Sequence, residues 1–410
     1  MTQRSAGARP QAGTGTITRS GLQRSRRKGP IGQWAFAAVA VTSLGGPLAL
    51  AALVVPGVVG DASASAGLVV LAAVVVFAAP LAIWRRYSRF ISSSGGLYAF
   101  VEAAAGQRVA RVQAGLWIVS YLLYVLYTTV QIVYDLLPAV LPGEHRYQSL
   151  LALLIPIALA AVMIAGRAAT LIVIAVMAVG QLVLAGILDG VTVAHLSTPA
   201  STFGSEATGP VVKASAQTSL LYICASLPLF LGGELAAPAR TTRRGLVGAY
   251  LLTAVVVLLA VAPLAAAPGL TRTAIPGVSV VKQFAGPGLA EIIGVGIAVS
   301  LAGVILVEFL ALTRLGHAIA PGRLRTVTIG LGALVVLVAP FSLINPDGFY
   351  NALVKPSLIA LWLSQLIVFA VYPRFAARYR QPMWSAWMLT LVASGLAVYG
   401  LWITVHQPAS

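Results

Sequence analysis

The feature that most constrains this chain is a series of apolar stretches, each long enough to cross a lipid bilayer. A hydrocarbon layer of about 30 Å takes about 20 helical residues. Such stretches fill the 410-residue chain from Trp34 onward, and no polar segment between them is long enough to form a soluble domain. We expect one all-α polytopic membrane domain over residues 31–405, with eleven spans at residues 34–56, 66–84, 113–138, 148–165, 168–188, 215–237, 246–266, 289–313, 326–344, 352–372 and 384–405.

The N-terminal residues have a different composition. Residues 1–30 are rich in Gly, Ser, Thr and Arg without apolar periodicity, which predicts a disordered tail. The first apolar run has spanning length, unlike the short core of a cleavable signal peptide. The single cysteine, Cys224, rules out a disulfide or a cysteine metal site within this chain. The four histidines fall in loops or at the C-terminal end, so we expect no metal and no cofactor.

Basic residues indicate the orientation of the spans. The chain has 27 Lys and Arg against 10 Asp and Glu, a formal net charge of +17. Cytoplasmic loops of membrane proteins retain Lys and Arg, and all but five of these residues fall in the tail and the even-numbered loops. We therefore expect a protein of the cytoplasmic membrane with its N-terminus inside and no nucleic-acid partner. The five on the other side are Arg146, Lys213, Arg272, Lys282 and Lys355.

Two spans contain helix-breaking residues near their middle. The first reads "AVTSLGGPLAL", with Gly45, Gly46 and Pro47, and the sixth reads "CASLPLFLGGE", with Pro228 and a glycine pair. Breaks at matching positions in two halves are typical of an inverted-repeat transporter whose site lies between them at the bilayer midplane. The repeats would cover residues 34–188 and 215–372, with an extra helix at 384–405.

Unwound backbone at membrane depth is tolerated only where it lines a cavity or is buried in protein. Its free amides and carbonyls can bind the carboxylate and ammonium of an amino acid. The alternative is that glycine and proline serve close helix packing alone. The candidate substrate-binding residues are Thr42, Ser43, Gly45, Gly46, Tyr124, Thr128, Ser226, Leu227, Pro228, Phe230, Gly232 and Gly233.

The chain resembles the amino acid, polyamine and organocation (APC) permease superfamily in three segments. Residues 92–124 are similar to the family's Gly-Gly-x-Tyr loop and the following Gly-x-Trp, residues 227–240 to its Phe-x-Gly-x-Glu, and residues 284–320 to its eighth span with Thr313 and Arg314 at the exit. The resemblance implies a five-plus-five inverted-repeat, LeuT-like fold and a secondary active transporter of amino acids.

The resemblance also directs attention to the coupling ion. A sodium site like the family's requires neighbouring hydroxyl groups on span eight. The hydroxyl residues of this span, Ser300 and Thr313, are far apart, so sodium coupling is disfavoured. Some proton-coupled members place a lysine on span five, where this chain has Gln181, which cannot titrate. The remaining candidate proton carriers are Glu234, Glu308 and Asp135, or the protein is an exchanger without ion coupling.

The two glutamates have different expected surroundings. Glu234 should lie in the unwound part of span six and face the cavity, either titrating during the cycle or bracing the break by hydrogen bonds. For Glu308, near the cytoplasmic end of span eight, an ion pair with a loop arginine is expected over transport chemistry. Both residues, with Gln181, are the candidates for coupling or gating.

Span three carries a polar stripe at helical spacing, which should face inward. It forms either a wall of the pathway or hydrogen bonds between helices. The stripe consists of Tyr121, Tyr124, Thr128, Gln131 and Asp135.

Other function classes have less support. No cluster of His, Asp, Glu or Cys suggests an enzyme, while a non-transporting sensor on the same fold stays open. A polyamine or organocation carrier would want several acidic residues in its site, and only Glu234 is clearly near it. The expected partners are therefore the bilayer and an amino acid with an apolar or small neutral side chain, and the oligomeric state stays open.

Overall fold

The computed structural model describes residues 31–59, 65–141, 143–196, 203, 208–265, 267–320, 322 and 324–406. The predicted tail, residues 1–30, lies outside these described residues. Within them nearly every segment is helical, and the helices belong to one compact unit, Ile31–Ser410.

Ten helices among the described residues are long and apolar enough to cross a membrane. A further apolar helix, α8 (Gln148–Ile164), has 17 residues, which is about 25 Å of helix and the short end of what spans a bilayer. It coincides with the predicted fourth span, and Gly166, with φ of +108°, separates it from α9 (Arg167–His195). The chain is therefore an all-α multi-pass membrane protein, as predicted.

The elements follow in chain order. The first half holds α1 (Gln33–Ser43), α2 (Pro47–Ala49), a π-helical turn (Leu50–Val54), α3 (Val55–Val59), α4 (Ala66–Ser88), α5 (Leu97–Ala105), α6 (Gln107–Val130), a second π-helical turn (Gln131–Leu136), α7 (Leu137–Val140), a 3-10 turn (Glu144–Tyr147), α8 and α9. The second half holds α10 (Thr208–Leu220), a 3-10 helix (Leu221–Glu234), α11 (Pro238–Ala265), α12 (Pro268–Thr271), α13 (Pro276–Ala285), α14 (Pro287–Ile319), α15 (Leu324–Val338), a 3-10 turn (Ala339–Leu343), α16 (Pro346–Ala370), α17 (Tyr372–Arg378) and α18 (Met383–His406).

The first span is broken where the sequence predicts it. α1 ends at Ser43, and Gly45 and Gly46 have φ of +82° and +70°, a backbone region that favours glycine. Pro47 then opens α2 at a position where its missing amide hydrogen costs no helical hydrogen bond. Two glycines and a proline thus divide this span into two short helical parts.

The sixth span changes its helix type instead of opening at one point. α10 passes into the 3-10 helix at Leu221, seven residues before Pro228, and this geometry continues to Glu234. Pro228 cannot donate to the carbonyl of Cys224, and its ring would clash with that carbonyl in an α-helix. The whole 14-residue stretch is therefore irregular, where the sequence predicted a break only around Pro228 and the glycine pair.

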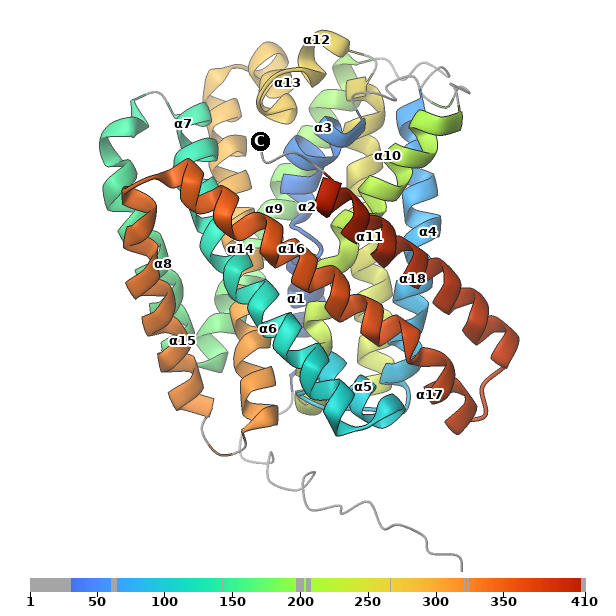
Figure 1. The fold of residues 1–410 in the computed structure, drawn as a ribbon. Helices are drawn as coiled ribbons and strands as arrows, with labels where there is room; N and C mark the ends of the chain where they lie inside the picture. The colour runs from blue at the N-terminus through green and yellow to red at the C-terminus, as the bar shows by residue number, and fades with distance from the viewer. Residues whose placement is uncertain are drawn as a thin grey trace, which may run out of the picture. The chain divides into compact units, whose positions relative to one another are not determined.

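The broken span, the sixth span and α14 are the most buried of the long helices, and α9, α15 and α18 are among the least. α1 packs against α9, α11 and α14, and the 3-10 helix packs against both α1 and α14. Figure 1 shows α6 and α16 side by side across the bundle. The two irregular segments therefore lie in the interior.

The outward faces of the peripheral helices are apolar. On α9, Ile172, Val176, Val179 and Val183 are exposed at helical spacing. An exposed apolar face of this length is expected where lipid, not water, surrounds the helix.

Candidate functional site

A hydrogen-bonded network of three helices lies beside the break in the first span. Gln181 of α9 donates from Nε2 to Thr42 Oγ1 of α1 (3.1 Å), and Ser300 of α14 donates from Oγ to Gln181 Oε1 (2.6 Å). All three side chains are buried. The amide of Gln181 thus links two hydroxyls, one as donor and one as acceptor.

Gly46, in the break of the first span, lies directly against this network. A Cβ added at this glycine would lie 2.0 Å from Ser300 Oγ and 3.0 Å from Gln181 Oε1. No larger residue fits there without displacing the network. Three of the predicted site residues, Thr42, Gly46 and Gln181, therefore meet at one place, together with Ser300, which the sequence had suggested only as an isolated hydroxyl.

Thr313, the other hydroxyl of α14, is not part of the network. It donates to the carbonyl of Leu310 on its own helix (2.8 Å). Its distance from Ser300 is 13 residues, about 20 Å along the helix axis. The two hydroxyls therefore cannot ligate one cation.

The 3-10 helix carries the predicted residues of span six. Ser226, Leu227, Pro228 and Phe230 are all buried. Ser226 donates to the carbonyl of Ile223 (3.2 Å) and accepts from Nε2 of Gln365 on α16 (3.4 Å). On α1, Ser43 likewise donates within its own helix, to the carbonyl of Ala40 (2.9 Å). The hydroxyls of Ser43 and Ser226 therefore both donate to backbone carbonyls of their own segments.

The polar stripe of α6 faces the interior along most of its length. Tyr121 and Thr128 are buried, Tyr124 is half-buried, and Asp135 is exposed at the end of the span. The hydroxyl of Tyr121 reaches Sγ of Cys224 on the 3-10 helix (3.9 Å). The inward orientation predicted from the spacing is confirmed.

Aromatic rings form a continuous ladder along this stripe. Neighbouring ring centroids lie 4.3 to 6.2 Å apart, which is the range of direct aromatic contact. We call these rings the aromatic ladder; in order they are Tyr350, Tyr127, Tyr124, Tyr121, Trp117 and Phe230.

The lower end of the 3-10 helix packs tightly against the segment before α5. A Cβ at Gly96 would lie 2.6 Å from the ring of Phe230, and Cβ atoms at Gly232 and Gly233 would lie 3.0 and 2.8 Å from the backbone of Ser93 and Ser94. The glycines of the two motifs therefore permit a close approach of two backbones.

Glu234 lies at the end of the 3-10 helix and is paired with two arginines. Its Oε2 accepts from Arg167 at the start of α9 (2.9 Å), and its Oε1 accepts from Arg314 of α14. Its backbone carbonyl accepts from the amide of Ile31 (2.8 Å), just before α1. Two distant arginines thus converge on this carboxylate, and it joins three elements, as expected of a glutamate that braces the break by hydrogen bonds. That it faces a cavity or titrates during transport stays a prediction.

Glu308 of α14 is buried and, in the part of the chain that the structure describes, lacks the ion pair that the sequence predicted. It is 0% exposed, and within the described residues neither carboxyl oxygen has a hydrogen-bond partner. The expected ion pair with a loop arginine does not occur in this part of the chain, and Arg314 pairs with Glu234 instead. Glu308 lies within electrostatic range of Tyr121, Tyr124 and Cys224.

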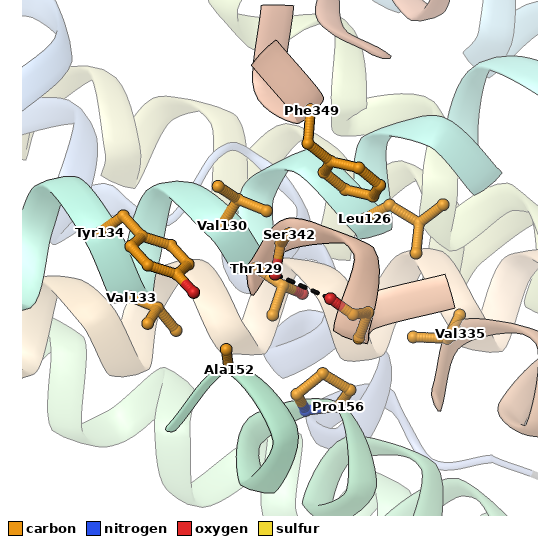
Figure 2. Close-up of a pocket in the computed structure, with 11 residues that line it drawn as sticks. Leu126, Thr129, Val130, Val133, Tyr134, Ala152, Pro156, Val335, Ser342 and Phe349 are labelled. Carbon is orange, nitrogen blue, oxygen red and sulfur yellow. Dashed lines mark hydrogen bonds between the residues drawn. The ribbon is translucent and has the colours of Figure 1, made fainter. Parts of the chain in front are cut away.

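Two pockets of the structure lie away from these residues. Figure 2 shows a pocket between α6, α8 and α16, lined mostly by apolar groups such as Val133 and Phe349, with Ser342 donating to the carbonyl of Ala339. It has room for little more than a water molecule. A second, open groove runs past Lys213 between α4, α10 and α18. None of the predicted site residues lines either one.

The described ranges of the chain contain no group of three or more His, Cys, Asp or Glu side chains that could hold a metal ion.

Solved structures share this arrangement of helices. MhsT in complex with L-phenylalanine has a TM-score of 0.64 at 15% identity, covering 92% of this chain and 99% of that one. A substrate-bound, outward-open Na⁺-coupled sialic acid symporter has a TM-score of 0.57 at 13% identity, covering 94% and 91%. A mutant of the Eremococcus coleocola manganese transporter has a TM-score of 0.57 at 13% identity, covering 90% and 87%. The fold is LeuT-like.

No protein-family model and no curated protein sequence matches this chain. The five-plus-five architecture expected from the sequence is therefore established by structure, whereas membership of the APC superfamily stays a prediction.

Proposed function

We propose that this chain is a secondary active transporter that moves amino acids across the cytoplasmic membrane by alternating access. The observation that carries the proposal is the broken first span, whose Gly45 and Gly46 lie in the interior beside the Gln181 network. Interrupted helices at the centre of a LeuT-like bundle present backbone groups to a ligand. MhsT, which shares the fold, was solved with L-phenylalanine, and this supports an amino acid as the substrate.

Transport is proton-coupled or an exchange, and it does not require sodium. Gln181 supports this view because its neutral amide occupies the space between Thr42 and Ser300 and satisfies both hydroxyls. A sodium ion would need those oxygens as ligands. The N-terminus lies in the cytoplasm, as the distribution of Lys and Arg indicates.

The test is counterflow in proteoliposomes. Vesicles loaded with unlabelled amino acids should accumulate the labelled amino acid in sodium-free buffer. Gly46→Val should abolish this, since its side chain would collide with Ser300, whereas Gly57→Val at an open position should retain it. Both variants need the same yield and elution volume as wild type.

Each alternative has its own outcome in this assay. Binding of amino acids without counterflow would identify a sensor and contradict transport. Counterflow of polyamines but not of amino acids would contradict the amino acid class. A strict sodium requirement would contradict the role given to Gln181.

A further inference from the structure

We propose that Glu308 binds the positively charged side chain of the substrate, so that the transported amino acids carry an ammonium or guanidinium group. This inference rests on the proposed function, because it names the class of amino acid taken by the same site. It starts from a carboxyl group in the interior of the bundle that the structure leaves without a partner.

Burial without a partner is costly for a carboxylate. Glu308 is 0% exposed, and neither of its oxygens has a hydrogen-bond donor among the described residues. Ionisable side chains inside a membrane bundle normally pair with one another or serve a ligand. Arg314, on the same helix as Glu308, pairs with Glu234 instead. A cation supplied by the substrate would complete this site.

The surroundings of Glu308 suit a cation. It lies within electrostatic range of Tyr121, Tyr124 and Tyr127, three successive rings of the aromatic ladder. Aromatic faces attract ammonium and, more often, guanidinium groups, and they do so most strongly where water is excluded. One carboxylate and a wall of tyrosines are therefore present together.

A second buried acceptor without a donor lies on α16. Gln365 donates through Nε2 to Ser226 of the 3-10 helix, while its Oε1 has no donor within the described part of the chain. An ammonium group has three donors and a guanidinium has five. A cationic side chain could therefore donate to such acceptors, whereas an aliphatic side chain could not.

The charges at the two ends of the aromatic ladder fit a cationic substrate. At one end the exposed Asp135 and Asp347 lie within electrostatic range of each other, and Tyr350 lies within range of Asp135. Acidic groups raise the local concentration of cations near them. Beyond Phe230, at the other end, two arginines pair with one glutamate, which leaves an excess positive charge there.

The sequence alone favoured an apolar or small neutral side chain, because Glu234 was the one carboxylate clearly near the predicted site. The structure pairs Glu234 with Arg167 and Arg314, so its charge is already balanced. It brings Glu308 into the cluster of Tyr121 and Cys224 instead. The expected charge of the substrate changes accordingly.

The experiment compares matched ligands on the purified full-length protein. Lysine is paired with norleucine and arginine with citrulline, because each pair differs mainly in the side-chain charge. Wild type should bind the charged member at least about tenfold more tightly. Glu308→Gln should remove most of that difference, while binding of the neutral member stays within about threefold of wild type.

Controls separate a binding role from a structural one. Glu291→Gln removes an exposed carboxylate from the same helix and should leave all four affinities unchanged. Tyr124→Leu tests the ladder if Glu308→Gln does not fold, and it should weaken lysine and arginine more than norleucine and citrulline. Thermal unfolding of each variant reports its folding.

Three results would overturn the inference or its basis. If wild type prefers norleucine or citrulline and Glu308→Gln keeps that preference, the inference is wrong while the proposed function stands. If Glu308→Gln changes only the pH dependence of neutral amino acid transport, Glu308 carries a proton and not a substrate charge. If no amino acid of either class binds or exchanges, the proposed function itself fails.

Discussion

Gln181 is a single side chain that holds three helices together at the break. Replacing it by methionine keeps the length of the side chain but leaves the hydroxyls of Thr42 and Ser300 without this partner. Interhelical hydrogen bonds in membranes contribute about 0.6 kcal/mol on average and up to about 1.7. We expect Gln181→Met to lower the free energy of unfolding by about 1–2 kcal/mol, measured by thermal or denaturant unfolding in detergent.

The matched control for this prediction is Gln107→Met at the exposed start of α6, which should leave stability unchanged. If Gln181→Met were as stable as wild type, the network would contribute nothing to holding the break. Transport by this variant in sodium-free buffer should fall with stability and should not be restored by sodium.

Residue roles could be predicted from the sequence only in part. Gln181 was identified from its place on span five, and the glycines at the break were identified by residue type. The arginine partners of Glu234 could not be predicted, because Arg167 and Arg314 are 67 and 80 positions away from it in sequence. Nor could it be predicted that Glu308 has no hydrogen-bond partner among the described residues. Local hydropathy shows that a carboxyl group lies within a membrane span. Which of the carboxyl groups forms ion pairs with the arginines depends on how the helices pack.

The 3-10 helix is the element whose end Glu234 fixes, and Cys224 on it reports whether it moves. This cysteine is the only one in the chain and is 5% exposed, so a thiol reagent should label it slowly in wild type. Glu234→Gln removes two partly exposed ion pairs, worth about 1–2 kcal/mol together. We expect labelling of Cys224 to become about tenfold faster, measured by mass spectrometry over time.

Two variants control this labelling experiment. Glu102→Gln, at an exposed position on α5, should label at the wild-type rate, and Cys224→Ser should not label. Glu234→Gln should also accumulate substrate with unchanged pH dependence if the glutamate is a brace. Loss of proton-driven accumulation with exchange retained would instead assign proton coupling to Glu234.

At the scale of elements, composition predicted the helices well and their irregularities less well. Spanning length and apolar composition located every long helix, because lipid forces the backbone to satisfy itself within each segment. The break at Gly45 and Gly46 was predictable, since both the residue type and its position are local signals. The start of the 3-10 helix at Leu221 was not, because nothing in "SLLYICAS" differs from an ordinary apolar helix.

The whole molecule has two ends that differ in charge, and this predicts its orientation. Figure 1 places α12 and α13 at one end of the bundle and α5 and α17 at the other. Exposed positions exist at both ends, Arg272 after α12 and Arg378 at the end of α17. In intact cells Arg272→Cys should react with an impermeant thiol reagent, and Arg378→Cys should react only after the membrane is permeabilised.

The buried native cysteine supplies the baseline for this measurement. Labelling of Arg378→Cys in intact cells would reverse the predicted orientation. Two further positions for the same test, Ser5 and Asp61, lie outside the described residues. Ser5→Cys should be protected and Asp61→Cys labelled.

The 14-residue 3-10 helix also has a mechanical consequence. A 3-10 helix rises about 2.0 Å per residue and an α-helix about 1.5 Å. Pro228 excludes α geometry just before it, but the seven residues Pro228–Glu234 could rewind from 3-10 to α geometry with Pro228 at the first helical position, and they would then shorten by about 3.5 Å. With α10 held in place, this retraction would pull Glu234 away from Arg167 and Arg314 and withdraw Gly232 and Gly233 from Ser93. Rewinding this part of the sixth span would therefore move the end at Glu234 without moving a whole helix.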